Sequence, residues 1–145
     1  MFAISHYSSR IQEILDPHGG GRRLMPLAPR EPLEGEGSAL LGRSSTADLF
    51  SGMSVAGSEA AECLRSALYL YFSDLDASHR ISQGIPSSAG SLLHGVMHRQ
   101  ATDFSNSKYW FRRVGGHDVF PPLRAGALEM PSDAPDAAGG RLHGE

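Results

Sequence analysis

The two longest segments of the chain without glycine or proline limit where long helices can form. Residues 58–83 and 96–114 contain neither residue type, whereas nine glycines and prolines fall within residues 17–37. Glycine leaves the backbone too free, and proline lacks the N–H donor that a helix interior needs. We therefore expect helices in the two uninterrupted segments and an irregular arm over residues 17–44.

The most apolar helix is predicted over residues 58–75. Ser58 can cap its N-terminus, where Glu59 and Glu62 suit the positive end of the helix dipole. Its apolar side chains recur every three or four residues and so form one stripe, made of Ala60, Leu64, Leu68, Tyr71 and Leu75. This helix is expected at the centre of the core, with Cys63 as a buried residue of the same side.

Weaker helical patterns surround this segment. Apolar spacing predicts helices over residues 5–16, 89–100 and 104–114, with two short helices over 46–51 and 79–83. Serine, threonine or aspartate stands at the expected start of the later helices, including Ser78 before residue 79, and Gly115 follows the last of them. The fold class is predicted to be all-α: a small helical domain of four or five helices.

The predicted domain has an extension on each side. Residues 1–44 are expected to form a short helix followed by the irregular arm, in which an apolar hook at 24–27 can lie on the core. Residues 45–125 are the predicted helical core domain. Residues 126–145 carry few large apolar side chains, so a flexible, disordered C-terminal tail is expected there.

Composition narrows the class of protein. The chain has 145 residues, the usual size of a single domain, and a net charge of -3. It has no apolar run of about eighteen residues and no secretory signal pattern at its start, so no membrane partner is expected. One cysteine permits no internal disulfide, which fits a soluble cytoplasmic protein. The acidic charge makes nucleic acid an unfavoured partner.

A histidine-rich motif is the first candidate site. His94 and His98 are four residues apart and so share one helix face, where two imidazoles can bind one divalent metal ion. Asp103 is the third predicted metal ligand, and Asp76, His79 and His117 are further candidates. The glutamate base of zinc enzymes with paired histidines is missing between them. The alternative is that one histidine packs in the core, while the other caps a helix or hydrogen-bonds a neighbour.

A basic, aromatic segment over residues 103–114 is the second candidate. Lys108 and Arg112, four residues apart, can hold a small anionic ligand on which Tyr109 or Trp110 stacks. Nucleic acid can use the same residue types. The structural alternative is that basic residues 98–113 pair by charge with acidic residues 58–76.

Part of the chain resembles a bacterial family whose function is not established. The resemblance covers residues 78–120 and rests on the words Ser-His-Arg-Ile-Ser-Gln, His-Gly-Val-Met-His-Arg and Lys-Tyr-Trp-Phe-Arg-Arg-Val-Gly, together with Asp103, Asn106 and His117. The family has two aromatic residues where this chain has Leu92 and Leu93. It has Arg-Glu-Pro where this chain has 100–102, so any role of that glutamate is absent here.

Two functions remain open beside a purely structural or interaction role. The first is a binding domain whose polar pocket holds an anion or a metal, formed by His79, His94, His98, Lys108, Arg112 and His117. The second is an enzyme with a histidine general base and an arginine that stabilises negative charge. Both require His94 and His98 to face the helix over 104–114, with Gly90 permitting close approach of another segment.

Overall fold

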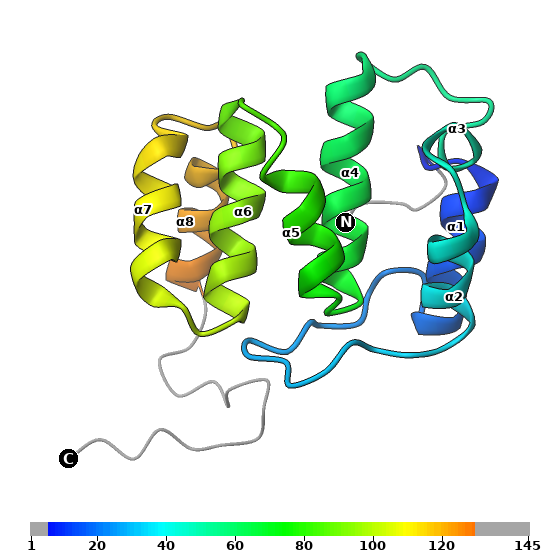
Figure 1. Cartoon of the computed structure of the whole chain (residues 1–145), viewed down its shortest axis with the longest axis horizontal. Coiled ribbons are helices and arrows are strands. Elements are labelled where there is room, and N and C mark those ends of the chain that lie inside the picture. Colours follow the sequence, from blue (N-terminus) through cyan, green and yellow to red (C-terminus); the bar gives the residue numbers. More distant parts are fainter. Residues whose placement is uncertain (1–5, 130–145) are drawn as a thin grey trace.

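The computed structural model describes residues 6–129, which form eight α-helices, one short 3-10 helix and no strand (Figure 1). The all-helical class is confirmed, but the predicted four or five helices are too few. The elements are α1 (Ser9–Leu15), η2 (Asp16–His18), α2 (Glu36–Arg43), α3 (Thr46–Leu49), α4 (Ser58–Tyr71), α5 (Leu75–Ser82), α6 (Ser88–Gln100), α7 (Phe104–Val114) and α8 (Phe120–Glu129). Within the described part of the chain, no helix has the length and apolar character needed to cross a membrane.

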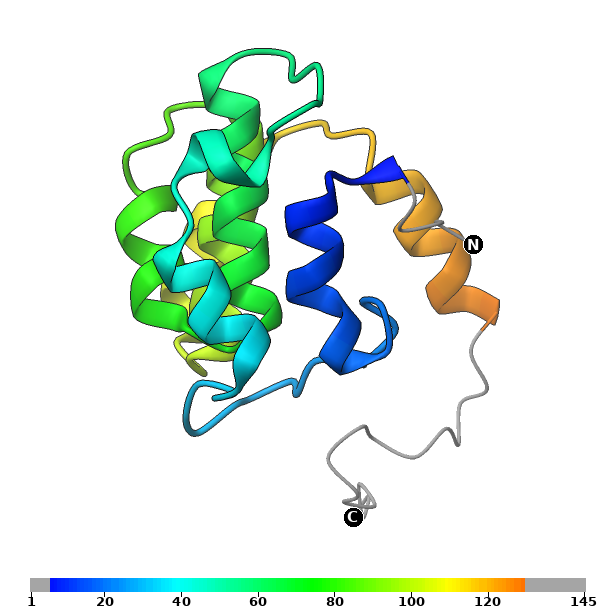
Figure 2. The same cartoon turned by 90° about the vertical axis from the view of Figure 1, so that its right-hand side faces the viewer.

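Helix α4 lies between two groups of helices (Figure 1), and Figure 2 views the molecule from the side of α1, α2 and α3. On one side, α1 packs against α2 and α3, and these two helices pack against α4. On the other side, α5 packs on α4, α6 packs on both, and α7 packs on α6. The main apolar core lies between α4 and the first group, and it consists of Ile11, Ile14, Leu15, Leu41, Leu49, Phe50, Ala61, Leu68 and Phe72. The central position predicted for this helix is thus confirmed.

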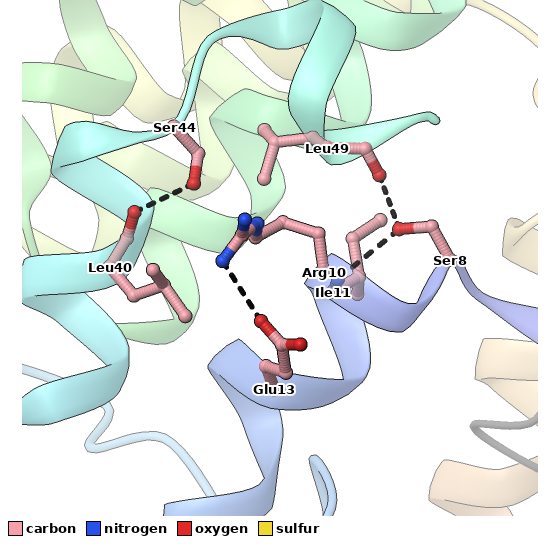
Figure 3. Close-up of polar contacts among 7 residues, drawn as sticks. All are labelled: Ser8, Arg10, Ile11, Glu13, Leu40, Ser44 and Leu49. Carbon is pink, nitrogen blue, oxygen red and sulfur yellow. Dashed lines mark hydrogen bonds and ion pairs between the residues drawn. The ribbon is translucent and has the colours of Figure 1, made fainter. Parts of the chain in front are cut away.

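Capping hydrogen bonds hold the first group together (Figure 3). The Ser8 hydroxyl caps α1 by accepting from the backbone N–H of Ile11 at 3.2 Å, and it also donates to the carbonyl of Leu49 at the end of α3. Ser44 donates to the Leu40 carbonyl at 2.8 Å, which closes the end of α2. The single hydroxyl of Ser8 therefore joins the start of one helix to the end of another.

The arm contains a helix that was not predicted. Residues 36–43 form α2, and Leu41 is fully buried in the core. Gly37 is needed for this packing, because a Cβ there would lie 2.3 Å from the Ile14 carbonyl oxygen. Gly37, one of the glycines that suggested an irregular arm, thus permits close packing. The predicted apolar hook is wrong, since Leu24 and Leu27 are 80% and 48% exposed.

The predicted 58–75 helix ends early, at Tyr71, and the predicted short helix over 79–83 begins earlier than expected, at Leu75. The chain leaves α4 after Tyr71, passes through Ser73 with a φ of 60°, and starts α5 at Leu75. The Asp74 carboxylate caps α5 by accepting from the Ala77 N–H at 3.0 Å, in place of the predicted Ser78 cap. Helix α8 lies partly in the predicted tail, and its side chains are not buried. The rest of that tail, residues 130–145, lies outside the described residues.

Small residues let α4, α5, α6 and α7 approach one another closely. The hydroxyls of Ser66 on α4 and Ser78 on α5 lie 2.9 Å apart and are both fully buried. Ser107 on α7 donates to the Gly95 carbonyl of α6 at 2.9 Å. This side of the fold is therefore held by polar contacts between closely packed helices as well as by apolar burial.

Gly90 permits the close approach of another segment, as expected, and that segment is the turn between α5 and α6. A Cβ at this position would lie 2.3 Å from the carbonyl oxygen of Ile85, so Gly90→Ala is expected to destabilise the protein by about 1–3 kcal/mol. Gly42→Ala on α2 is the matched control, because no atom lies within 4 Å of its added Cβ. That change is expected to stabilise by about 0.5–1 kcal/mol. Urea denaturation of the two variants measures both effects, and equal stabilities would contradict the packing of Gly90.

Candidate functional site

Three histidines meet where α5 packs against α6. His79 comes from α5, and His94 and His98 come from successive turns of α6. One ligand nitrogen from each side chain lies within 4.8 Å of the other two. The ring centroids are 4.6 Å apart for His79 and His94, 4.9 Å for His94 and His98, and 5.6 Å for His79 and His98.

His94 is the buried member of this histidine cluster, with 2% of its surface exposed. The Nδ1 atom of His94 lies 3.0 Å from the hydroxyl of Ser82 on α5. The ring centroids of His94 and of Trp110 on α7 are 4.1 Å apart. Burial, together with the charges of the neighbouring His79 and His98, lowers the pKa of His94 to about 4. His94 is therefore a neutral imidazole near pH 7 and a weak general base, which disfavours its use in the enzyme hypothesis.

His98 is oriented by a carboxylate at the start of α7. Its Nδ1 lies 3.4 Å from Oδ2 of Asp103. Burial lowers the pKa of His98, and the negative charge of Asp103 opposes that shift. The backbone N–H and side-chain amide of Asn106 both donate to Asp103, at 3.2 and 2.7 Å, and these bonds lower the pKa of the aspartate. Asp103 is thus held as an ionised acceptor beside His98.

The Nδ1 partners determine which nitrogens remain for a ligand. Ser82 lies at Nδ1 of His94, and Asp103 lies at Nδ1 of His98. The Nε2 atoms of both rings are therefore the nitrogens left for another partner. In metal sites, a histidine bound through one nitrogen donates its other N–H to a carboxylate or another oxygen acceptor. The arrangement around the two α6 histidines matches that pattern.

Three other predicted site residues lie away from the histidine cluster. Lys108 and Arg112 are exposed. At about 100° per residue, they are on the opposite side of α7 from Asp103 and Trp110. His117 follows α7, where its Nδ1 accepts from the Val119 N–H at 3.2 Å. Of the six residues of the predicted pocket, the structure thus brings together the three histidines, and Asp103 lies beside them.

Ser82 was missed as a partner of the site, and a signal for it exists in the sequence. Ser82 follows His79 by three residues, so both lie on one face of α5 once that helix is known to begin at Leu75. The predicted helix over 79–83 was too short to show this shared face.

The charge-pairing alternative receives no support from the ion pairs. Across residues 6–129, the two ion pairs are Arg10–Glu13 and His98–Asp103, and neither joins α4 to α7. The basic residues of α7 are therefore not neutralised by the acidic residues of α4, and their positive charge faces solvent or a ligand.

Comparison with models of protein families, with curated proteins and with solved structures finds no match for this chain.

Proposed function

We propose that this protein is a metal-binding helical domain in which His79, His94 and His98 hold one divalent transition metal, with zinc as the best-suited ion. The convergence of three imidazoles from two helices, with ligand nitrogens within 4.8 Å of one another, carries the proposal. Imidazole is a preferred ligand of zinc, and three histidines form a known set of protein ligands for it.

The protonation states favour a metal. Metal binding requires neutral imidazoles, so protons compete with the ion at each ligand. Burial lowers the pKa of both His94 and His98. Protons therefore compete with a metal less strongly at these two rings than at an exposed histidine. Metal–nitrogen bonds of about 2.0–2.1 Å require the three nitrogens to draw closer than 4.8 Å on binding. Small rotations of the rings supply that movement, since His79 and His98 are only partly buried.

Direct metal titration tests the proposal. The purified full chain, stripped of metal with a chelator, is titrated with Co²⁺ and then with Zn²⁺ while visible absorption is recorded. We expect one equivalent of cobalt to give the intense absorption bands of a four-coordinate ion, and zinc to displace it. Isothermal titration calorimetry with zinc gives the affinity and the stoichiometry. Weak binding of several ions without a cobalt spectrum would contradict the proposal.

Asp103 is expected to strengthen the site without binding the metal itself. Asp103→Asn removes the charge that faces Nδ1 of His98, and loss of such an outer partner typically lowers metal affinity about 10- to 100-fold. The measurement is competition with a chromophoric zinc chelator. Asp118→Asn is the control, because Asp118 is exposed and follows α7, and it should leave the affinity unchanged. An equal affinity for wild type and Asp103→Asn would show that the carboxylate has no such role.

A further inference from the structure

One stripe of α7 borders the histidine cluster. Asp103, Asn106, Trp110 and Arg113 follow one another at spacings of three or four residues, so they share a side of the helix. Asp103 contacts His98, and the Trp110 ring lies 4.1 Å from the ring of His94. The stripe therefore follows the cluster from its more exposed histidine to its buried one, and Arg113 is at the far end.

Arg113 is held over aromatic rings rather than against a carboxylate. Its guanidinium carbon lies 5.3 Å from the centre of the Trp110 ring and 5.7 Å from that of Tyr109. Its Nη1 donates to the Tyr109 hydroxyl at 3.4 Å. Neither ion pair found across residues 6–129 involves Arg113. Trp110 thus contacts both a candidate metal ligand and a guanidinium whose positive charge remains available.

We infer that the metal site binds a small carboxylate or other oxyanion at the metal, and that Arg113 supplies the positive charge that selects it. The inference rests on the proposed function. A zinc ion with three histidine ligands keeps one coordination position for water or another ligand. Arg113 is linked to the cluster through the Trp110 ring, and the planar N–H groups of a guanidinium match anions with two oxygens. The sequence pattern favoured Arg112 for this role, and the two neighbouring arginines therefore make a direct comparison.

Anion titration of the cobalt-loaded protein tests this inference. Acetate and azide are titrated separately into wild type, Arg113→Ala, Arg112→Ala and Arg43→Ala, and the change in the visible cobalt spectrum gives each affinity. Arg43 is the distant control, since it is exposed at the end of α2, on the opposite side of the molecule from α7 (Figure 1). We expect both anions to change the wild-type spectrum. Arg113→Ala should weaken acetate binding about tenfold or more, while the other two variants bind as wild type does.

The outcomes separate this inference from the proposal on which it rests. Cobalt binding is measured first, and its absence in wild type would overturn the metal site itself. If cobalt binds but neither anion changes the spectrum, the metal site stands and the open position is refuted. If Arg112→Ala weakens acetate binding and Arg113→Ala does not, or if both bind acetate as wild type does, the assignment to Arg113 is wrong.

Discussion

Replacing His79 by glutamine is expected to lower the affinity for zinc by more than about 100-fold. The change removes one of three ligands, which should cost more than the roughly 10- to 100-fold typical of an outer partner. His79 is suited to this test because it is partly exposed, and its replacement leaves the buried His94 in place. Competition with a chromophoric chelator measures the affinity, and circular dichroism checks that the helices remain.

His117→Gln is the matched control for this prediction. His117 lies beyond α7, where its ring contacts Phe120 rather than the histidine cluster, so its loss should not change zinc affinity. The comparison of His79→Gln with Asp103→Asn also distinguishes two ligand sets. The sequence pattern indicated His94, His98 and Asp103, whereas the structure favours the three histidines. If Asp103→Asn lowers the zinc affinity more than His79→Gln does, the ligands are His94, His98 and Asp103.

Acid is expected to destabilise the metal-free protein through His94. The folded pKa of His94 is about 4, against 6.5 for a free histidine. As the pH falls below 6.5, the unfolded chain binds a proton that the folded protein does not, so the free energy of unfolding decreases. The decrease is about 1.4 kcal/mol per pH unit and approaches about 3 kcal/mol near pH 4. Well above pH 6.5 both states are neutral at this residue, and its contribution to the pH dependence vanishes.

Urea denaturation in the presence of EDTA, repeated from pH 7 to pH 4, measures this effect. Carboxylates also titrate in this range. The informative quantity is therefore the slope of the free energy of unfolding against pH, compared between wild type and His94→Gln. We expect the variant to lose much less stability on acidification, whatever its stability at pH 7. His98 contributes in the same direction, because burial also lowers its pKa. Identical slopes for the two proteins would contradict the buried, neutral state of His94.

Helices with strong local signals were predicted well. Ser87 and Asp103 cap α6 and α7 by accepting from backbone N–H groups three residues later, and both helices begin within one residue of their predicted starts. Capping and apolar spacing act within a few residues, so sequence alone carries them. The predictions failed where packing overrides such signals. Gly37 and Gly42 would disfavour an isolated helix, yet burial of Leu41 in the core stabilises α2.

The candidate site likewise has features that the sequence predicted and features that depend on tertiary packing. The spacing of His94 and His98 placed both rings on one side of α6, and Gly90 indicated a close approach. The structure confirms the inward position of His94 and shows a close approach of the Ile85 backbone to Gly90. His79 was predicted as a residue of the pocket but only as a further candidate for the metal, because its place in the histidine cluster depends on how α5 packs against α6. Pairing of residues on separate helices follows from side-chain shape and burial, which no local pattern contains.

Local chemistry therefore determined the helical class, the later helix boundaries and the shared face of His94 and His98. Tertiary packing determined the third histidine, the hydroxyl of Ser82 at His94, and the side of α7 that borders the cluster. Arg112 and Arg113 are equivalent in residue type and neighbours in the chain. They differ because about 100° of helix rotation separates them, so only Arg113 stacks on Trp110, the residue that contacts His94.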